Sequence, residues 1–448
     1  MWGGGKWLVQ NKVLPGFYHR FLSAAKDGIA ISDRGNAAIG LELDWGPDGQ
    51  IVTVENSDFQ KDTRKLFGYS YTDEEMRPLR EIFLNAVTLY YYRLNGGGDK
   101  ATCKWADAKY TGTRGNSLKI VISAAVDATG MFDVDTYLAG AKVDTQRVAA
   151  ITDLEDNDFV VWKDTAGALS ADAGTSLTGG TNGTTDGAAH QAFLDKAERV
   201  AFHTLACNSS DKVTIALYVA YTKRMCDEVG KVFQCVVPGT QYATATPTTA
   251  ESVDPDNYNI IVVQNKVLDA GAPEFALIYW ALGAHAGVAV NKTLQNRIYN
   301  GEYKVDTDHT QTELKKFIET GKFAFHEAGE KVRVLADINS FVTLTEEEQG
   351  EFKNNQSVRV FYQQITDISA TFNKNWQGIT PNDKDGRSAF RGVVIKYLQT
   401  LQDIRAIQEF DPDTVTVEKG DAKGSVLLNY PTNAVNAMYQ LYATITVE

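Results

Sequence analysis

The sequence predicts a multidomain protein that combines α/β and α+β parts with a small β-sandwich and extended terminal arms. Three observations predict this fold class. The chain has 448 residues, enough for about two to four domains of ordinary size. Short strands without intervening helices fill residues 102–173, whereas helices alternate with apolar strands after residue 190. Residues 1–28 and 437–447 have the composition of extended segments.

Composition indicates an acidic protein with ample material for packed cores. Hydrophobic residues make up 43% of the chain, and its formal net charge is -13. This charge argues against a nucleic-acid partner, which needs a basic face to bind phosphates. Four cysteines occur without a C-x-x-C pair, which predicts reduced thiols and neither a zinc site nor a disulfide framework. We expect no cofactor.

The most apolar stretch, residues 275–290, predicts a buried core helix. It is shorter than the roughly 20 residues that a membrane span needs, and it contains His285. Pro273 lies where the first turn of a helix favours proline. We therefore expect no membrane insertion, and the chain start lacks the apolar core of a signal peptide.

The first half of the chain divides into four predicted parts. Residues 1–28 are an N-terminal linking arm, in which Lys12–Phe21 favours a short strand without a neighbouring partner strand in the sequence. Residues 29–101 alternate strand, helix and strand as an α/β segment, and residues 102–173 are the β-sandwich. Residues 174–190 are rich in glycine and threonine, which is typical of a linker.

The second half contains two further predicted domains. In residues 191–340, apolar strands alternate with helices, which predicts a parallel sheet buried on both faces. Residues 341–448 form a C-terminal α+β domain with helices at 357–376 and 386–404. A hairpin follows, and an alternating pattern over 437–447 predicts a long terminal strand.

The sequence contains no constellation that predicts catalysis or metal binding. Gly174-Thr-Ser176 echoes the serine motif of subtilases, but it lies in the predicted linker without a helix to present the serine. No histidine is followed by glycine, and there is no H-E-x-x-H or calcium-binding loop. We predict no catalytic residue and no metal ligand.

Catalytic and metal-binding motifs do not explain the two terminal arms. A strand without a local partner has backbone groups that must be satisfied elsewhere. Strand addition to a neighbouring subunit would satisfy them. The alternative, that both arms fold back onto their own chain, is equally compatible with the pattern.

Several motifs in order along the chain resemble those of contractile phage tail sheath proteins. The resemblance is strongest to the short-sheath branch of Gram-positive phages, defective prophages and phage-tail-like bacteriocins. It covers nearly the whole chain and rests on the following segments: Arg34–Pro47, Tyr110–Asn116, Ala281–Asn296, Val334–Phe341 with its Asp-Ile-Asn, Asp385–Arg387, and the closing hairpin and strand between Asp413 and Val447.

The resemblance implies a fold and a mechanical function. The fold has an inserted β-sandwich, a subtilisin-like but non-catalytic middle domain at residues 191–340, and a C-terminal sheath domain. Such subunits polymerise as hexameric rings around the tail tube and contract to drive it through a target envelope. Their partners are copies of themselves, the tail tube protein, the baseplate and the tail terminator. They belong to a virion tail or phage-tail-like particle assembled in the bacterial host cytoplasm.

The resemblance also implies where subunits meet. Arms of neighbouring subunits add to the C-terminal sheet, which predicts these contact residues: Val13, Leu14, Phe17, Tyr18, Phe21, Met438, Leu441, Tyr442, Ile445 and Val447. In the family the C-terminal domain contacts the tube. Arg387, Arg391 and Arg405 fall within about 40° of each other on an ideal helix, so we expect them to face an acidic tube patch. An intramolecularly paired edge is the alternative for these arginines.

Two other function classes remain as alternatives. A non-contractile structural or adhesin tail component would also contain a β-sandwich, and a hydrolase could use a subtilisin-like fold. The missing triad disfavours the hydrolase. The sequence does not distinguish an infectious phage from a bacteriocin or defective prophage.

Overall fold

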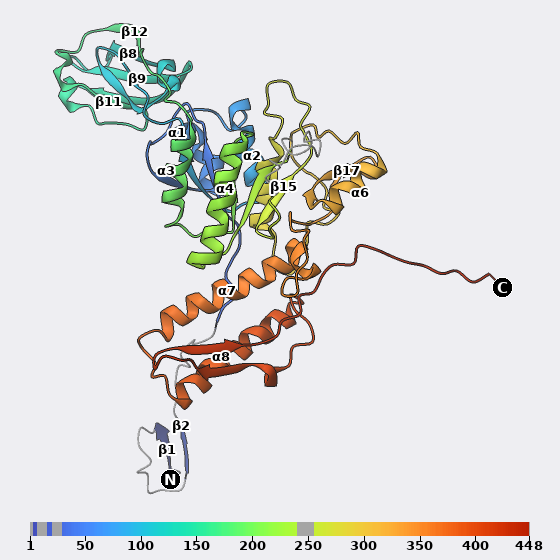
Figure 1. Ribbon diagram of the computed structural model, residues 1–448. Helices are drawn as coiled ribbons and strands as arrows, with labels where there is room; N and C mark the ends of the chain where they lie inside the picture. Colours follow the sequence, from blue (N-terminus) through green and yellow to red (C-terminus); the bar gives the residue numbers. More distant parts are fainter. Residues whose placement is uncertain (1–2, 7–15, 20–28, 240–254, 448) are drawn as a thin grey trace. The chain divides into compact units, whose positions relative to one another are not determined.

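The computed structural model describes residues 3–6, 16–19, 29–239 and 255–447. The chain divides into two compact units (Figure 1). The central unit comprises residues 33–362 and 434–448, and the C-terminal unit comprises residues 1–32 and 363–433. The sequence placed the boundary of the C-terminal domain at residue 341, about twenty residues before the position at which the chain enters the C-terminal unit.

A seven-stranded sheet forms the core of the central unit, in the order β16-β15-β14-β13-β3-β5-β4. All neighbouring strands are parallel except β4 and β5. The strands are β3 (Asn36–Leu41), β4 (Ile51–Glu55), β5 (Thr88–Arg93), β13 (Thr204–Ala206), β14 (Gln234–Pro238), β15 (Ile260–Val263) and β16 (Lys322–Phe323). The predicted parallel sheet is confirmed, but it includes strands from residues 29–101. That segment and residues 191–340 share one sheet because β3 pairs with β13.

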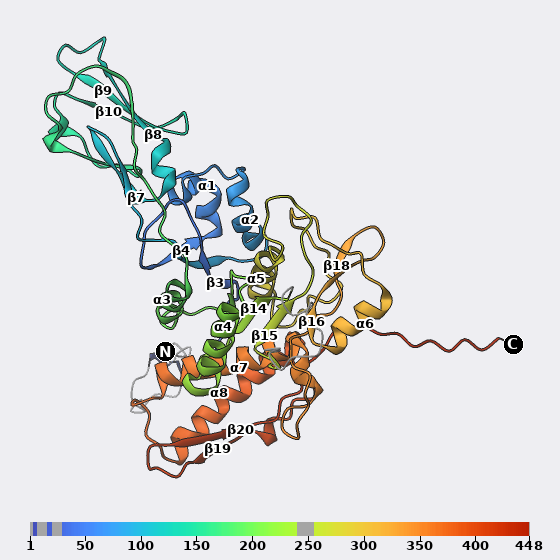
Figure 2. The ribbon, with the colours of Figure 1, turned by 45° about the horizontal axis from the view of Figure 1, so that its top comes forward.

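Helices cover both faces of this sheet, and alternate strand residues point to each face. Ile261 and Val263 pack among residues of α1 (Asn56–Phe67), α2 (Arg77–Phe83) and α5 (Leu277–Gly287). Ile260 and Val262 pack instead among residues of α3 (Gly187–Ala197) and α4 (Lys212–Arg224). Figure 2 shows the labelled strands of the sheet with α4 and α5 beside them.

The apolar stretch at 275–290 contains the buried helix that the sequence predicts. Residues 277–286 of α5 are all buried. A Cβ on Gly283 would lie 2.1 Å from the carbonyl oxygen of Ile82, so glycine lets α5 approach α2 closely. Among the described residues, no helix combines the length and the apolar character needed to cross a bilayer.

The β-sandwich is inserted between β5 and α3 and consists of two antiparallel sheets, ordered β10-β9-β8-β12 and β11-β7-β6. Its strands are β6 (Lys100–Thr102), β7 (Ala106–Thr111), β8 (Leu118–Ala124), β9 (Phe132–Leu138), β10 (Ala141–Val148), β11 (Val160–Trp162) and β12 (Asp172–Ser176). The segment predicted as a linker differs from the prediction, because 174–176 lie in β12 and Thr178 bridges to Thr102. Its small polar residues resemble a linker in composition, but their backbone groups complete the sandwich.

Smaller elements complete the central unit. The capping box Thr310/Glu313 begins α6 (Gln311–Glu319) as the sequence predicts. β17 (Phe325–Glu327) pairs with β18 (Val332–Val334). β18 ends at Val334, and Asp337 beyond it forms hydrogen bonds that hold the start of the next helix.

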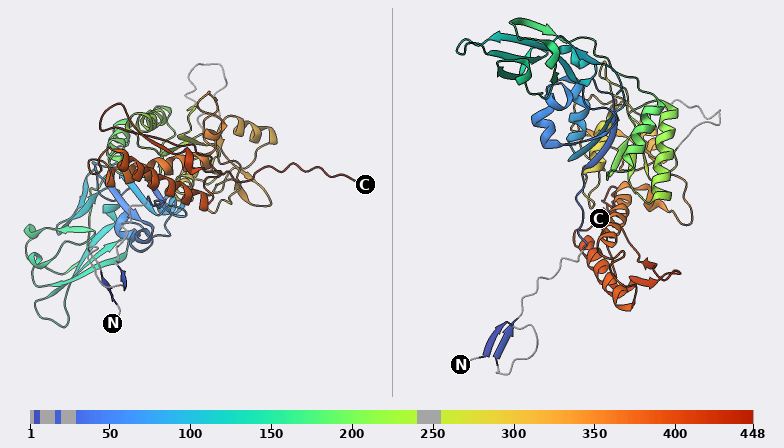
Figure 3. Two further views of the ribbon diagram at one scale, coloured as in Figure 1. Left: turned by 90° about the horizontal axis from the view of Figure 1, so that it is seen from below. Right: turned by 90° about the vertical axis from the view of Figure 1, so that its left-hand side faces the viewer.

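The C-terminal unit contains two long helices and one hairpin, coloured orange and red in Figure 3. The helices are α7 (Asn355–Asn375) and α8 (Lys384–Asp403), which confirm both predicted helices. The hairpin is formed by β19 (Thr416–Lys419) and β20 (Val426–Asn429), paired antiparallel. The N-terminal strands β1 (Gly3–Lys6) and β2 (Gly16–His19) pair only with each other in the described chain.

Candidate functional site

The predicted N-terminal arm has a partner strand within its own chain. Phe17 and Tyr18 lie in β2, which pairs in parallel with β1. The expectation that this strand lacks a local partner is therefore wrong. The glycines of Gly3–Lys6 carry no side chains that favour a strand, so their pattern did not predict β1. Val13, Leu14 and Phe21 lie outside the described residues.

The predicted C-terminal strand is not a strand in this chain. Residues 437–447 follow an extended course and pair with no strand of the described residues (Figure 1). Their apolar side chains are almost fully solvated, with Leu441 90%, Ile445 84% and Val447 90% exposed. An alternating segment forms a strand only where its backbone is hydrogen-bonded to the edge of another strand, and residues 437–447 have no such pairing among the described residues.

The C-terminal arm, which we define as residues 437–447, becomes amphipathic if it is extended. Side chains of a strand alternate between its two faces. The odd positions from Tyr439 to Val447 are all apolar, whereas positions 440, 444 and 446 carry Gln, Thr and Thr. Met438 and Tyr442 share the more polar face. The arm thus has one face suited to burial against a core.

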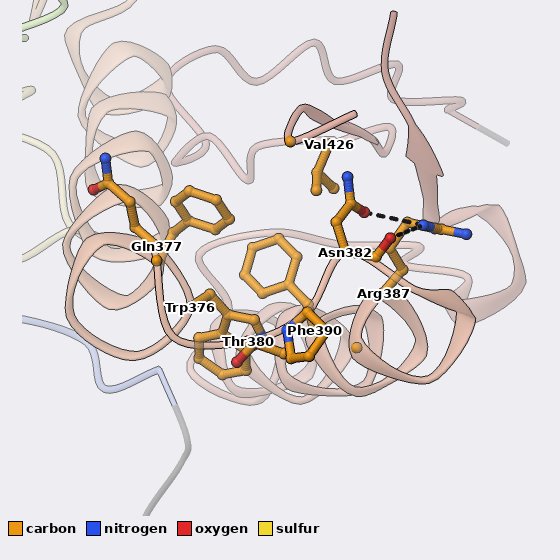
Figure 4. Close-up of a pocket in the computed structure, with 12 residues that line it drawn as sticks. Trp376, Gln377, Thr380, Asn382, Arg387, Phe390 and Val426 are labelled. Carbon is orange, nitrogen blue, oxygen red and sulfur yellow. Dashed lines mark hydrogen bonds between the residues drawn. The ribbon is translucent and has the colours of Figure 1, made fainter. Parts of the chain in front are cut away.

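The C-terminal unit has cavities beside its hairpin that such a strand could cover. A cavity of about 320 Å³ lies beside β20. It is lined by apolar residues of both helices and the hairpin, with a few polar residues of α7: Gln364, Ile365, Ile368, Ser369, Phe372, Asn373, Phe390, Val426, Leu428 and Tyr430. A second cavity of about 220 Å³ shares Phe372, Phe390 and Val426 with it (Figure 4). We call the two cavities together the apolar trough.

One edge of β20 remains open beside this trough. β20 pairs with β19 along one edge, and the two-stranded sheet has no third strand among the described residues. Val426 and Leu428 are half-buried, whereas Leu427 between them is 50% exposed and points to the other face. On α7, Ile365 is 45% exposed. A strand added to β20 would receive backbone hydrogen bonds and cover these apolar groups.

The three arginines predicted to face a tube do not lie on one helix face. The α8 helix ends at Asp403, and Arg405 beyond it has a left-handed backbone with φ of 60°. The expected alignment is wrong because Arg405 terminates the helix rather than continuing it. Its side chain is exposed.

The other two arginines form hydrogen bonds within the C-terminal unit. Arg387 Nη1 donates to the backbone and side-chain oxygens of Asn382, both at 3.0 Å (Figure 4). Arg391 donates to the carbonyl oxygens of Val415 at 2.6 Å and Pro412 at 2.8 Å, which ties α8 to the start of the hairpin. Arg405 is therefore the one of the three predicted arginines whose side chain is exposed. That the arginines contact a tube stays a prediction.

A buried ion pair holds the beginning of α7 in the central unit. Arg359 Nη2 lies 2.7 Å from Asp337 Oδ2, and both side chains are 1% exposed. Burial alone would raise the pKa of Asp337, but the adjacent Arg359 charge holds it well below its usual range. Asp337 also accepts hydrogen bonds from Leu294 N at 2.9 Å and Asn355 Nδ2 at 3.1 Å. The predicted Asp-Ile-Asn motif is thus a structural joint.

Two buried histidines have pKa values far below the ordinary value. Burial lowers the pKa of His285 to about 3, and neither ring nitrogen has a hydrogen-bond partner among the described residues. Burial likewise lowers the pKa of His203 to about 3, and its Nδ1 accepts from Asn36 N at 3.2 Å. Ser176 lies in β12 of the sandwich. The described residues contain no group of three or more His, Cys, Asp or Glu placed to hold a metal ion.

Models of known protein families match almost the whole chain. Four family models match successive segments: the tail sheath protein Gp18 domain III N-terminal region (34–94), the phage tail sheath protein beta-sandwich domain (95–182), its central domain (183–340) and its C-terminal domain (347–448). The phage-like element PBSX protein XkdK of Bacillus subtilis (strain 168) is 29% identical, with 99% of both chains covered.

Solved structures give the same result. The sheath tail protein of Desulfitobacterium hafniense is 31% identical, covers 94% of this chain and 96% of its own, and superposes with a TM-score of 0.79. The sheath tail protein Lin1278 of Listeria innocua is 27% identical, with 92% and 94% covered and a TM-score of 0.76. The contracted helical sheath of the anti-feeding prophage shares the fold at 14% identity and a TM-score of 0.56, with 97% and 99% covered. The chain therefore belongs to the phage tail sheath protein family.

Proposed function

We propose that this chain is the subunit of a contractile sheath that polymerises around a tail tube. The observation that carries the proposal is that the same chain has an exposed extended segment and a sheet edge without a partner strand among the described residues. Its C-terminal arm is extended and exposed, and its β19–β20 hairpin has an open edge beside an apolar trough. A second copy supplies what each of these two lacks.

Strand addition between copies gives a polymer rather than a closed pair. The donor segment and the acceptor edge are different surfaces, so the contact is heterologous and repeats from subunit to subunit. Residues 16–19 and 437–447 are the proposed donors. The described part of β2 has β1 on one side only, so its other edge remains available. Hexameric rings stacked on a tube are the arrangement we propose.

Contraction requires two lattices connected by the same arms. We propose that rings rotate and slide from an extended to a wider and shorter lattice, which drives the tube through a target envelope. Rigid-body motion between two packings is a known class of transition. Main-chain hydrogen bonds of an added strand do not depend on a particular orientation of the remaining surfaces, which supports persistence of the arms during such a motion.

We infer that the chain acts mechanically and not as an enzyme. The burial of His285, whose pKa is lowered to about 3 and whose ring nitrogens have no hydrogen-bond partner among the described residues, supports this inference. The proposed partners besides its own copies are a tail tube protein, with Arg405 as the exposed candidate contact, and baseplate and terminator proteins. The net charge of -13 disfavours binding to the phosphates of a nucleic acid, so we propose no nucleic-acid partner. The proposed setting is a phage tail or phage-tail-like particle assembled in the host cytoplasm.

Electron microscopy of the expressed chain tests this proposal. We expect the full chain to form striated tubes, and chains lacking residues 1–22 or 437–447 to remain small particles or short, unlinked rings. Small closed oligomers of the full chain would favour an adhesin instead. Tubes from a chain lacking both segments would contradict strand addition by the arms. Labelling by an active-site serine probe would contradict the non-enzymatic role.

A further inference from the structure

A buried carboxylate holds the chain at the root of the N-terminal arm. Ser32 Oγ donates to Asp367 Oδ1 at 2.6 Å, and the Ser32 backbone N lies 3.3 Å from the same oxygen and 3.4 Å from Oδ2. Ser32 itself is solvent-exposed, whereas Asp367 is 3% exposed. The two residues are 335 positions apart in the sequence and belong to the same C-terminal unit.

The side chains of Gln363 and Tyr397 also contact this carboxylate. We call the four residues Ser32, Gln363, Asp367 and Tyr397 the arm clasp. Gln363 Nε2 donates to Ser32 Oγ at 2.7 Å and to both carboxylate oxygens of Asp367, at 3.0 and 2.9 Å. Tyr397 OH, from α8, donates to Asp367 Oδ2 at 2.8 Å. Ion pairs to Asp367 are absent from the described residues, so neutral donors alone satisfy this carboxylate. Burying a carboxylate is costly unless several hydrogen bonds compensate.

The next attachment along the chain lies in the other unit. Arg34 Nε donates to Val288 O at 3.0 Å, and Gly35 O accepts from Val87 N at 2.9 Å, both within the central unit. One exposed residue, Asp33, therefore separates a point held by α7 and α8 from points held by the central unit. Without the clasp, the buried side chain of Ile29 would remain in the C-terminal unit, and the next described attachments along the chain are those of Arg34 and Gly35.

We propose that Asp367 is a positioning residue that assigns the N-terminal arm to the C-terminal unit. This inference rests on the proposed function, in which the arm links subunits. The twelve residues between His19 and Ser32 span at most about 40 Å. Releasing the clasp leaves the buried side chain of Ile29 as the remaining hold on this segment. Once Ile29 is also released, the origin of the arm moves to Gly35, which adds about 10 Å of extended chain and transfers the arm to the other unit. The clasp keeps the arm attached to the same unit that contains the acceptor hairpin, whichever way the central unit moves.

Hydrogen exchange in the full chain tests the clasp itself. The variant Ser32→Ala removes one donor from an exposed residue, and Asp367→Asn places an amide donor where Ser32 and Tyr397 also donate. We expect either change to raise the exchange rate of residues 29–33 about tenfold, the effect of losing one charge-assisted hydrogen bond. Tyr397→Phe is the matched control, because it removes a donor to Asp367 but leaves Ser32 in contact. Unchanged exchange in Ser32→Ala would overturn the clasp.

The dissociation of assembled sheath in urea tests the positioning role. We expect Ser32→Ala sheath to dissociate at a lower urea concentration than wild-type and Tyr397→Phe sheath. In the short rings or small particles that we expect from chains lacking residues 1–22, Ser32→Ala should leave the urea concentration of dissociation unchanged, since no arm remains to be positioned. A difference that persists there would indicate ordinary structural damage and overturn the proposal. If the wild-type chain forms no sheath, the proposed function fails, whereas the exchange measurement still decides whether the clasp exists.

Discussion

In the central unit seven strands lie between helices on both faces, whereas in the C-terminal unit two long helices carry a hairpin of two short strands. One isoleucine from each unit illustrates the difference. Ile261 of β15 is fully buried, but Ile365 of α7 is 45% exposed beside the apolar trough. Apart from the arm at 437–447, the central unit buries its sheet between helices, whereas the C-terminal unit leaves an edge and a trough exposed. In the assembly that we propose, another chain completes this edge and trough.

Breaking the buried ion pair of the central unit should have the largest effect on subunit stability. Arg359→Ala leaves Asp337 charged and buried without its cation, and we expect the free energy of unfolding to fall by about 3–5 kcal/mol. The double variant Asp337→Leu/Arg359→Met should recover most of this loss, because no unpaired charge remains. Urea denaturation measures both. A double variant no more stable than Arg359→Ala would show that the charge is not the cause.

The same truncation in each unit directly tests the contrast between a closed and an open core. Ile261→Ala should reduce the free energy of unfolding by about 2–5 kcal/mol, because it leaves a cavity in a packed core. Ile365→Ala should cost less than about 1 kcal/mol, since its side chain is partly solvated in the subunit. Sheath formation, measured by sedimentation, should be weakened by Ile365→Ala. Equal losses of stability in the two variants would refute the idea that the trough is open in the free subunit.

The pH dependence of stability should report the closed interior of the central unit. His285 has a pKa of about 3 in the folded chain and an ordinary value near 6.5 when unfolded. Between these values only the unfolded chain binds the proton, so stability falls as the pH falls through this window. At pH 5 this costs about 2 kcal/mol. His285→Phe should reduce the stability difference between pH 8 and pH 5 by that amount, as followed by thermal denaturation. An unaltered pH dependence would mean that water reaches His285.

Charges on the apolar face of the C-terminal arm should leave the thermal stability of the subunit unchanged but should prevent the formation of tubes. Leu441→Asp/Ile445→Asp places charges on the apolar face of the proposed strand, and Thr444→Asp/Thr446→Asp places the same charges on the other face. Because Leu441 and Ile445 are 90% and 84% exposed, we expect the melting temperature of the subunit to stay unchanged. Only the first pair should abolish tubes in electron micrographs. Loss of tubes in both pairs, or in neither, would contradict burial of the odd face.

Local pattern was enough to predict the elements whose stability is local. The capping box at Thr310, the helices α7 and α8, the β19–β20 hairpin and the buried helix α5 all follow from periodicity and turn chemistry. The alternation of residues 437–447 was equally visible in the residues, but it predicted a strand that the chain does not form. These features depend on neighbours within a few turns or on side-chain alternation, which the sequence contains directly.

Long-range pairing decided the rest. That β3 joins β13, that residues 174–182 complete the sandwich, and that Arg405 ends α8 with a left-handed backbone depend on contacts that no local pattern encodes. The pairing of β1 with β2 was hidden by glycines, and the arm clasp joins residues 335 positions apart. The order of residues alone was enough to predict terminal segments with an arm-like composition and to find no recognisable catalytic motif. The open edge of β20 and the starting point of the N-terminal arm emerged only from the folded chain, because hydrogen-bond partners and burial are properties of the fold.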